Sequence, residues 1–325
     1  MTQLPAIPVT IIGGYLGAGK TTLLNSLLRG DHGMRLAILV NDFGSINIDA
    51  ALIASHRGET VSLTNGCVCC NMADNLAIAL LELLGRDIPP DHIVIEASGV
   101  ADPGKVASYG AAHPRLRLDS LIVVADAETV RARSVDKYVG ELVVRQLVAA
   151  DLVVLSKLDL IDESNRVCVR NFLRETVPHA TLLEACHGLL PWDLLLGVGA
   201  TPSQTKVAPY SRRGGPAPKQ ESPSFSRASF ENERPFDRGR LREILEALPE
   251  SVIRVKGVVY VAGEGSHSFV LQKVGRHWTL EAGSPCERGA RLSQLIMIGT
   301  WGPADIPHLI EGFRWALTDE LVATP

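Results

Sequence analysis

The chain has no run of about 20 apolar residues, so its sequence predicts no membrane-spanning helix. It also has no surplus of basic residues. The 32 Lys and Arg against 36 Asp and Glu leave a net charge of −4, which gives no reason to expect nucleic-acid binding. The first ten residues, MTQLPAIPVT, lack the basic start and long apolar stretch of a signal peptide. We therefore expect a cytoplasmic protein without a membrane or nucleic-acid partner.

The six cysteines do not have the spacing of a disulfide framework, because three of them fall within Cys67-Val68-Cys69-Cys70. Three thiolates this close can converge on one cation, and soft ligands suit Zn²⁺ or a similar metal. A fourth position would stay open for water, a mobile side chain or a receiving protein. Inert buried cysteines and a redox-active pair are the alternatives. The scattered Cys168, Cys186 and Cys286 are expected to be core residues.

The stretch from Val9 to Leu28 has the order strand, glycine loop, helix. Residues Gly14–Thr21 fit the phosphate-loop pattern G-x-x-x-x-G-K-[ST] between an apolar β-branched run and a helical segment. Glycines let backbone N–H groups turn toward phosphates, and the amino end of the helix adds positive charge. Lys20 would contact the β- and γ-phosphates, and the Thr21 hydroxyl would bind Mg²⁺. The sequence therefore predicts nucleoside triphosphate binding.

Over residues 9 to about 190, apolar runs alternate with helical segments, which predicts a parallel sheet with polar residues at the strand ends. The runs expected to be buried strands after the first are Leu36–Val40, Ile93–Ile95, Leu121–Val124 and Leu152–Leu155. Glu96 follows one such run and is placed to orient Mg²⁺ or its waters, while Gly99 would let the next loop approach the γ-phosphate. Asp126, which follows another run, competes with Glu96 for the same role. Spacing favours Glu96 slightly.

Ser156-Lys157-Leu158-Asp159 follows a later strand and corresponds to the Asn-Lys-x-Asp sequence of GTPases. There the aspartate accepts hydrogen bonds from guanine and the lysine stem packs on the base, so GTP is expected over ATP. Ser156 replaces the asparagine, so one support of this loop differs from the GTPase sequence.

The fold class expected is α/β, a P-loop NTPase domain with a mostly parallel sheet and a smaller α+β C-terminal domain. The GTPase domain would span residues 1–200 and the C-terminal domain residues 225–325. Residues 201–224 contain five prolines and no apolar periodicity, which predicts a linker.

Taken together, Gly13–Asn25, Gly66–Cys70, Glu96–Gly99 and Ser156–Asp159 resemble the CobW-type metallochaperone GTPase family, which is related to the urease and hydrogenase nickel-insertion GTPases. The C-terminal part resembles the family's second domain through Arg234-Pro235-Phe236-Asp237, Arg254-Val255-Lys256-Gly257 and Leu295–Gly299. The resemblance implies weak GTP hydrolysis and delivery of zinc, cobalt or another divalent metal to a client protein.

By position, the resemblance assigns catalytic roles to Lys20, Thr21 and Glu96, with Mg²⁺ on Thr21 and Glu96. The transported Zn²⁺ or Co²⁺ would bind Cys67, Cys69 and Cys70. The GTP or GDP site would comprise Gly14, Gly17, Ala18, Gly19, Lys20, Thr21, Thr22, Gly99, Ser156, Lys157 and Asp159. Two departures are that residues 41–45 read Asn-Asp-Phe-Gly-Ser, with fewer carboxylates than the family's loop, and that residues 201–224 contain no histidine.

We expect bound GTP to order the loops after Val40 and Glu96, so that metal held by the cysteines responds to the nucleotide. No glutamine or arginine is placed by sequence to orient water or stabilise the transition state, which predicts slow turnover. The alternatives are a metal-responsive nucleotide-binding regulator without turnover and a P-loop small-molecule kinase. The sequence leaves the oligomeric state open, a homo-oligomer included.

Overall fold

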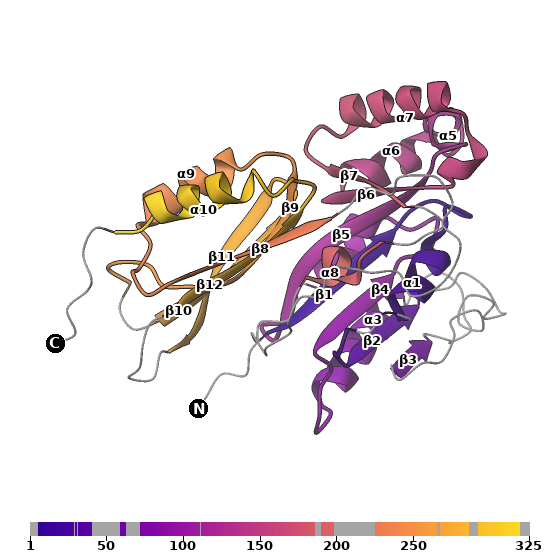
Figure 1. Cartoon of the computed structure of the whole chain (residues 1–325). Coiled ribbons are helices and arrows are strands. Elements are labelled where there is room, and N and C mark those ends of the chain that lie inside the picture. The colour runs from indigo at the N-terminus through magenta and orange to yellow at the C-terminus, as the bar shows by residue number, and fades with distance from the viewer. Residues whose placement is uncertain are drawn as a thin grey trace.

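The computed structural model describes residues 6–28, 30, 32–40, 59–62, 72–110, 112–185, 190–197, 225–264, 267–285 and 292–318. Figure 1 shows two bodies, each with its own sheet. In this part of the chain, no helix is both long enough and apolar enough to cross a membrane.

The first body is built on a seven-stranded sheet in which every pairing is parallel, with the order β3-β2-β4-β1-β5-β6-β7. The strands are β1 (Ile7–Gly13), β2 (Leu36–Val40), β3 (Glu59–Ser62), β4 (His92–Glu96), β5 (Leu116–Asp126), β6 (Leu152–Ser156) and β7 (Thr181–Glu184). The helices are α1 (Lys20–Leu28), α3 (Met72–Leu84), α4 (Pro103–Gly110), α5 (Val130–Ser134), α6 (Gly140–Val148), α7 (Glu163–Thr176) and α8 (Trp192–Leu196), with a 3-10 turn at Leu158–Leu160.

Helices cover both faces of this sheet. Because successive residues of a strand point to opposite faces, one strand contributes to two apolar cores. Val9 and Ile11 of β1 belong to the apolar core formed with α3, α4, α6 and α7. Ile12 belongs to the core on the other face, formed with α1 and α8. The near-continuous burial of the strands reflects this double cover. The predicted α/β fold with a parallel sheet is confirmed.

The second body is a five-stranded antiparallel sheet of order β11-β10-β9-β12-β8, with two helices side by side on one face (Figure 1). Its elements are β8 (Ser226–Asn232), α9 (Arg238–Ala247), β9 (Val252–Val259), β10 (His267–Val274), β11 (His277–Pro285), β12 (Ser293–Gly299) and α10 (Ile306–Trp315). Phe230, Phe236 and Phe313 pack together in its core, with ring centroids 5.7–6.5 Å apart. The predicted smaller α+β domain is confirmed, whereas the predicted linker lies outside the described residues.

The two bodies share an apolar core at their junction. Ile253 of β9, Val274 of β10 and Ile298 of β12 belong to the same buried cluster as α1 and the leucines of α8. The turn after β10 also reaches the first sheet, because a Cβ at Gly275 would stand 3.1 Å from the backbone oxygen of Asp151. The second sheet thus packs against the first body partly through this shared apolar cluster.

A charged cluster is buried in the same junction. Arg254 of β9 donates to the Asp119 carboxylate of β5 and, over 3.0 Å, to the Leu194 carbonyl. The ammonium of Lys256 lies 3.8 Å from Asp119 Oδ1. Thr10 donates its hydroxyl to Asp119 Oδ2 over 3.5 Å, and His92 Nε2 lies 2.9 Å from the same hydroxyl. We refer to Thr10, His92, Asp119, Arg254 and Lys256 as the junction cluster.

Candidate functional site

The loops that follow β1, β4, β5 and β6 lie at one edge of the first sheet, where the carboxyl ends of parallel strands meet. In the strand register, Ile12 of β1 is opposite Glu96 of β4, and Asp126 of β5 is opposite Ser156 of β6. Open α/β sheets bind ligands outside these carboxyl ends. The sheet therefore gathers there all the predicted nucleotide and Mg²⁺ residues.

The phosphate loop, residues 14–21, is shaped by glycines with positive φ. These are Gly14, Gly17 and Gly19, with φ values of 132°, 73° and 102°. At Gly14 a Cβ would stand 2.3 Å from the carbonyl oxygen of Val124, so only glycine lets the loop pass this close to β5. Lys20 begins α1, and its ammonium donates to the Gly14 carbonyl over 3.0 Å. The loop thus holds a cation beside the amino end of a helix, an arrangement suited to phosphates.

Thr21 and Glu96 face each other across this edge. The Thr21 hydroxyl donates to Glu96 Oε1 over 3.5 Å, and the carboxylate is only 3% exposed at the end of β4. A hydroxyl and a carboxylate are the hard oxygen ligands that Mg²⁺ prefers. The residues present therefore fit a magnesium ion at this position.

Asp126, the competing carboxylate, is engaged elsewhere. Its Oδ2 accepts from the ammonium of Lys157 over 2.7 Å, and its Oδ1 accepts from the Glu128 backbone over 3.0 Å. Lys157 has a left-handed φ of 56°, unusual for a residue with a side chain. This geometry makes Asp126 a support for the loop that holds Lys157, and it favours Glu96 as the carboxylate beside Thr21.

Ser156 connects the predicted guanine loop to the phosphate loop. Its buried hydroxyl lies 2.6 Å from the Ala18 carbonyl and 3.2 Å from the Ala125 carbonyl, and it donates to either. Gly19 passes beside it, since a Cβ there would stand 3.7 Å from Ser156 Cβ. Asp159 is exposed in the 3-10 turn that follows. The serine thus touches the loop backbone, while Asp159 is open to a ligand.

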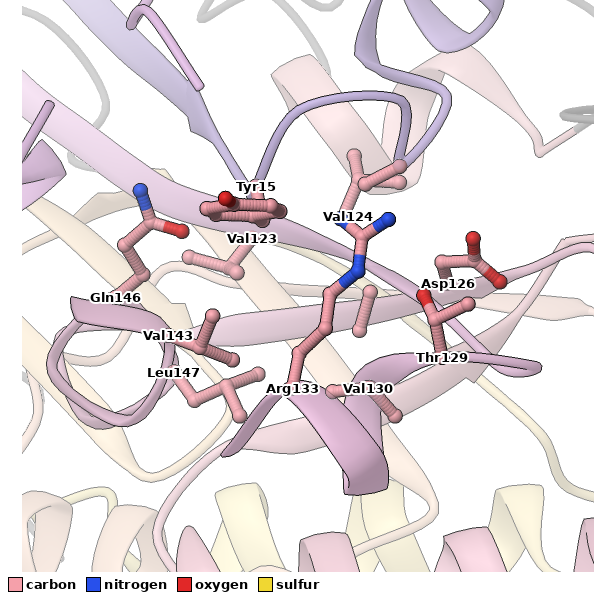
Figure 2. A pocket seen from close by; sticks show the side chains of 12 residues that line it. Tyr15, Val123, Val124, Asp126, Thr129, Val130, Arg133, Val143, Gln146 and Leu147 are labelled. Carbon is pink, nitrogen blue, oxygen red and sulfur yellow. The ribbon is translucent and has the colours of Figure 1, made fainter. Parts of the chain in front are cut away.

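A small pocket lies behind the phosphate loop, lined by residues of β5, α5 and α6 (Figure 2). Arg133 reaches toward Tyr15, with its guanidinium carbon 4.6 Å from the ring centroid, and donates to the Leu16 carbonyl over 2.9 Å. Gln146 is buried beside Val143 and donates to the carbonyls of Gly99 and Ala101. The two loops at the site are therefore contacted from behind by two helices.

Sequence reasoning missed both Arg133 and Gln146. A signal was present in the sequence for Gln146, which stands at helical spacing with Val143 and Leu147 on an otherwise apolar face. In the structure this residue is 1% exposed. A polar residue at such a position needs a hydrogen-bond partner. Arg133 had no comparable signal, because it is one of two arginines in a five-residue helix.

The predicted metal cysteines Cys67, Cys69 and Cys70 lie outside the described residues, and so does the predicted switch segment 41–45. Among the residues that are described, no group of three or more His, Cys, Asp or Glu could hold a metal ion. The prediction that Cys168 is a core residue is wrong. It lies exposed on α7, whose buried face is formed by Val169 and Leu173.

Comparisons with known proteins agree with both bodies of the fold. The family model described as CobW/HypB/UreG, nucleotide-binding domain, matches residues 8–184, and that of the cobalamin synthesis protein cobW C-terminal domain matches residues 225–317. Zinc chaperone YjiA of Escherichia coli (strain K12) is 30% identical over 314 residues, 92% of this chain and 96% of that protein. Zinc chaperone CobW of Sinorhizobium sp is 36% identical over 222 residues, 59% of this chain and 63% of that protein.

Among solved structures, that of Zn(II)-bound YjiA GTPase from E. coli is 24% identical, covers 97% of this chain and 100% of that one, and has a TM-score of 0.45. The two family models together span nearly all of the described residues, and the first alone matches more than half of the chain. The chain therefore belongs to the CobW/HypB/UreG family of nucleotide-binding proteins and carries the CobW C-terminal domain.

Proposed function

We propose that this chain is a GTP-hydrolysing metallochaperone, which binds a divalent metal, zinc in first place and cobalt in second, and delivers it to a client protein. The observation that carries the proposal is the single sheet edge at which Lys20, Thr21, Glu96 and the Ser156–Asp159 loop converge. It is supported by the family membership of both domains and by relatives named zinc chaperones and zinc-regulated GTPase metalloprotein activators.

In the proposed site, the phosphates of GTP lie against the loop amides of Gly14, Gly17, Ala18 and Gly19 and those at the start of α1, up to Thr22. Lys20 would exchange its contact with the Gly14 carbonyl for contacts with the β- and γ-phosphates. Thr21 and Glu96 would hold Mg²⁺, which supplies neutralisation of phosphate charge when bound. Gly99, which has no side chain, would let the backbone of the loop after Glu96 lie close to the γ-phosphate.

Guanine recognition is assigned to Asp159, whose exposed carboxylate offers two acceptors to the two adjacent donors of the base. Lys157 would pack its stem on the ring while Asp126 holds its ammonium. Ser156 contributes by fixing this loop to the phosphate loop through Ala18. We expect GTP to be preferred because adenine offers no matching donors.

The cargo metal is assigned to the thiolates of Cys67, Cys69 and Cys70. These residues lie in sequence between segment 41–45 and the loop after Glu96, so reorganisation of both segments around the γ-phosphate would change the metal affinity. We further propose the division into residues 1–200, 201–224 and 225–325 and a cytoplasmic location. The partners proposed are GTP and a client protein that receives the metal.

The proposal is tested by two measurements on one purified sample. The affinity for Zn²⁺ and for Co²⁺ is measured in the GDP form and with β,γ-imido GTP, and GTP turnover is measured with each metal. We expect metal affinity to differ about 5–150-fold between the two nucleotide states, the usual range of coupling between sites. Replacement of Cys67, Cys69 and Cys70 together by serine should remove this difference in metal affinity. The affinity for GTP in metal-free buffer should stay nearly unchanged. Cys168→Ser, on the exposed cysteine of α7, is the matched control.

Two results would overturn the proposal. Identical metal affinities in both nucleotide states would reduce the cysteines to a structural or redox feature. GTP binding with no turnover, even with metal and client present, would instead support a metal-responsive regulator.

A further inference from the structure

Two helices behind the site each direct one polar side chain at a different loop of the nucleotide edge. Arg133 comes from α5 and Gln146 from α6, the helices that follow β5 in the chain. Both side chains bind backbone carbonyls and line the same pocket (Figure 2).

Gln146 supplies both hydrogens of its amide to the loop that follows Glu96. The donor distances are 3.1 Å to the Gly99 carbonyl and 2.8 Å to the Ala101 carbonyl. Because both neighbours are carbonyl oxygens, the side chain must present its NH₂ group to them. Gln146 is 1% exposed and its contact with Gly99 is buried, so loss of its donors would leave the Gly99 carbonyl without this partner away from water.

Arg133 holds the phosphate loop in a comparable way. Its Nη1 donates to the Leu16 carbonyl over 2.9 Å, and the guanidinium lies 4.6 Å from the Tyr15 ring centroid. A cation over an aromatic face is attracted by the ring, which adds to the hydrogen bond. Two consecutive residues of the phosphate loop are thus bound by one arginine.

The two loops also touch each other directly between these contacts. A Cβ at Gly99 would stand 2.7 Å from the Leu16 nitrogen and 2.6 Å from Leu16 Cδ2, so the loops are in close van der Waals contact. Leu16 is held at its carbonyl by Arg133, and Gly99 is held at its carbonyl by Gln146. The four residues form one uninterrupted chain of contacts from α5 to α6.

We propose that Arg133 and Gln146 are positioning residues that clamp the phosphate loop and the loop after Glu96 at a fixed spacing, and that this spacing sets the rate of GTP hydrolysis. The inference rests on the proposed GTPase function. Thr21 ends the clamped phosphate loop, and Glu96 ends β4 immediately before the second clamped loop, so a looser clamp would displace one relative to the other. A displacement of about 1 Å in a catalytic constellation can reduce the rate about a hundredfold.

Gln146→Met tests the clamp, because methionine keeps the length of the side chain and removes the donors. We expect kcat for GTP hydrolysis to fall about tenfold to a hundredfold and GDP affinity to change by less than about threefold, since the residues assigned to guanine and to the Lys20 contact stay in place. Arg145→Met, at the neighbouring exposed position of α6, should change kcat by no more than about twofold.

Arg133→Met should lower kcat about tenfold, and Arg133→Lys should restore part of the loss because the cation remains near Tyr15. Arg131→Met on the exposed face of α5 is its control. If both residues serve one clamp, the double variant should lose less than the product of the two single losses. Should Gln146→Met not fold, as judged by thermal unfolding, the half-exposed Arg133 gives the same measurement.

Two outcomes would overturn the clamp: single variants that lower the thermal midpoint with kcat unchanged, and single losses that multiply independently in the double variant. The unmodified chain tests the function separately. If it does not hydrolyse GTP, the ratio of β,γ-imido GTP to GDP affinity becomes the readout. An unchanged ratio in both Gln146→Met and Arg133→Met then contradicts the clamp.

Discussion

The two ends of the seven-stranded sheet differ in which groups form them and in how deeply those groups are buried, and β5 contributes to both ends. At its carboxyl end, glycines and backbone carbonyls shape the loops, and the Lys157–Asp126 pair leaves the lysine side chain 36% exposed. Nearer its amino end, Asp119 is fully buried against Arg254, which is 2% exposed. The first end is open to a ligand, whereas the second is closed by the C-terminal domain.

One carboxylate faces two cations in the junction cluster. Burial alone would raise the pKa of the Asp119 carboxyl, but the charges of Arg254 and Lys256 outweigh it and hold this pKa below its usual range. Burial lowers the pKa of Lys256 to about 8, against the opposing effect of Asp119. Burial also lowers the pKa of His92 to about 3, so this histidine is neutral at pH 7.

Charged side chains at the loop end of the sheet are available to a ligand, whereas those of the junction cluster bind one another. At the junction, Arg254 and the Thr10 hydroxyl both donate to Asp119 Oδ2, and the ammonium of Lys256 lies 3.8 Å from Oδ1. A buried ion pair is weak evidence for net stability, but breaking one is strongly destabilising. We therefore expect substitutions at the junction to change folding and substitutions at the loops to change binding.

The largest effect is expected at the junction. Asp119→Ala would leave Arg254 and Lys256 buried without their carboxylate, which should lower the free energy of unfolding by about 3–5 kcal/mol. Denaturant unfolding measures this. Glu141→Ala, which removes the partner of an exposed Arg145 pair, is the matched control. A loss below about 1 kcal/mol, the value of a surface pair, would contradict the contrast between the two ends.

The next effect belongs to the loop end. Lys20→Ala should weaken GTP binding at least about a hundredfold, because two or more charge-assisted hydrogen bonds are each worth about 1.5–3 kcal/mol. Folding should be retained, since the side chain contacts loop carbonyls rather than the apolar core. Calorimetric titration with GTP gives the affinity, and Lys137→Ala at an exposed position is the control. Unchanged GTP affinity in the folded variant would refute the phosphate assignment.

Asp159→Asn should weaken GTP about tenfold to a hundredfold, because an amide replaces one acceptor by a donor and about 1.5–3 kcal/mol is lost. Xanthosine triphosphate, which presents the complementary pattern, should gain affinity. Asp162→Asn is a control three residues away, since asparagine caps α7 as well as aspartate does. The assignment fails if the unmodified protein binds ATP and GTP equally well.

The smallest effect concerns pH at the edge of the junction. The hydrogen bond that His277 donates to the Asp151 carboxylate raises the pKa of His277 above its ordinary value, against burial and the charge of Lys273. The His179 ring stacks on His277, with ring centroids 6.2 Å apart. A raised folded pKa means that this stabilisation is complete below about pH 6.5, the unfolded value, and is lost as pH rises through the folded value.

Because the His277 side chain is 66% exposed, the loss should stay below about 1 kcal/mol. The measurement is the difference in unfolding free energy between the parent and His277→Gln across this range, with His308→Gln on α10 as the control. A parent-minus-variant difference that does not shrink with rising pH would show that the pair contributes nothing.

The elements that sequence reasoning found and missed differ in how fully they are buried. Leu36–Val40 was predicted as a strand and is one, because it is buried on both faces and reads as a continuous apolar run. The strands β8 and β11 were missed because they are the two edges of the antiparallel sheet. Only Ala228 and Phe230 of β8 are buried, between polar neighbours, which is a weak signal.

β5 shows the same limit within a single strand. The sequence indicated only its apolar part, Leu121–Val124, whereas the strand begins at Leu116. The missing segment carries Arg117 and Asp119, and charged residues in a short segment are typical of a loop. In the structure these charges are paired with Glu281 and Arg254 of the C-terminal domain. The charged residues that made this part of the strand hard to recognise are the residues that contact the second domain.

The sequence by itself determined the order strand, glycine loop, helix at residues 9–28. It also determined the positions of Lys20, Thr21, Glu96 and Asp159 at strand and loop ends, because these features are local in the chain. Only the tertiary structure decided which distant groups meet. Ser156 reaches Ala18 across 138 residues, Arg254 reaches Asp119 across 135, and Gln146 reaches Gly99 across 47. Such pairs depend on the strand order β4-β1-β5-β6 and on where the second sheet docks, and no residue pattern within one segment contains either.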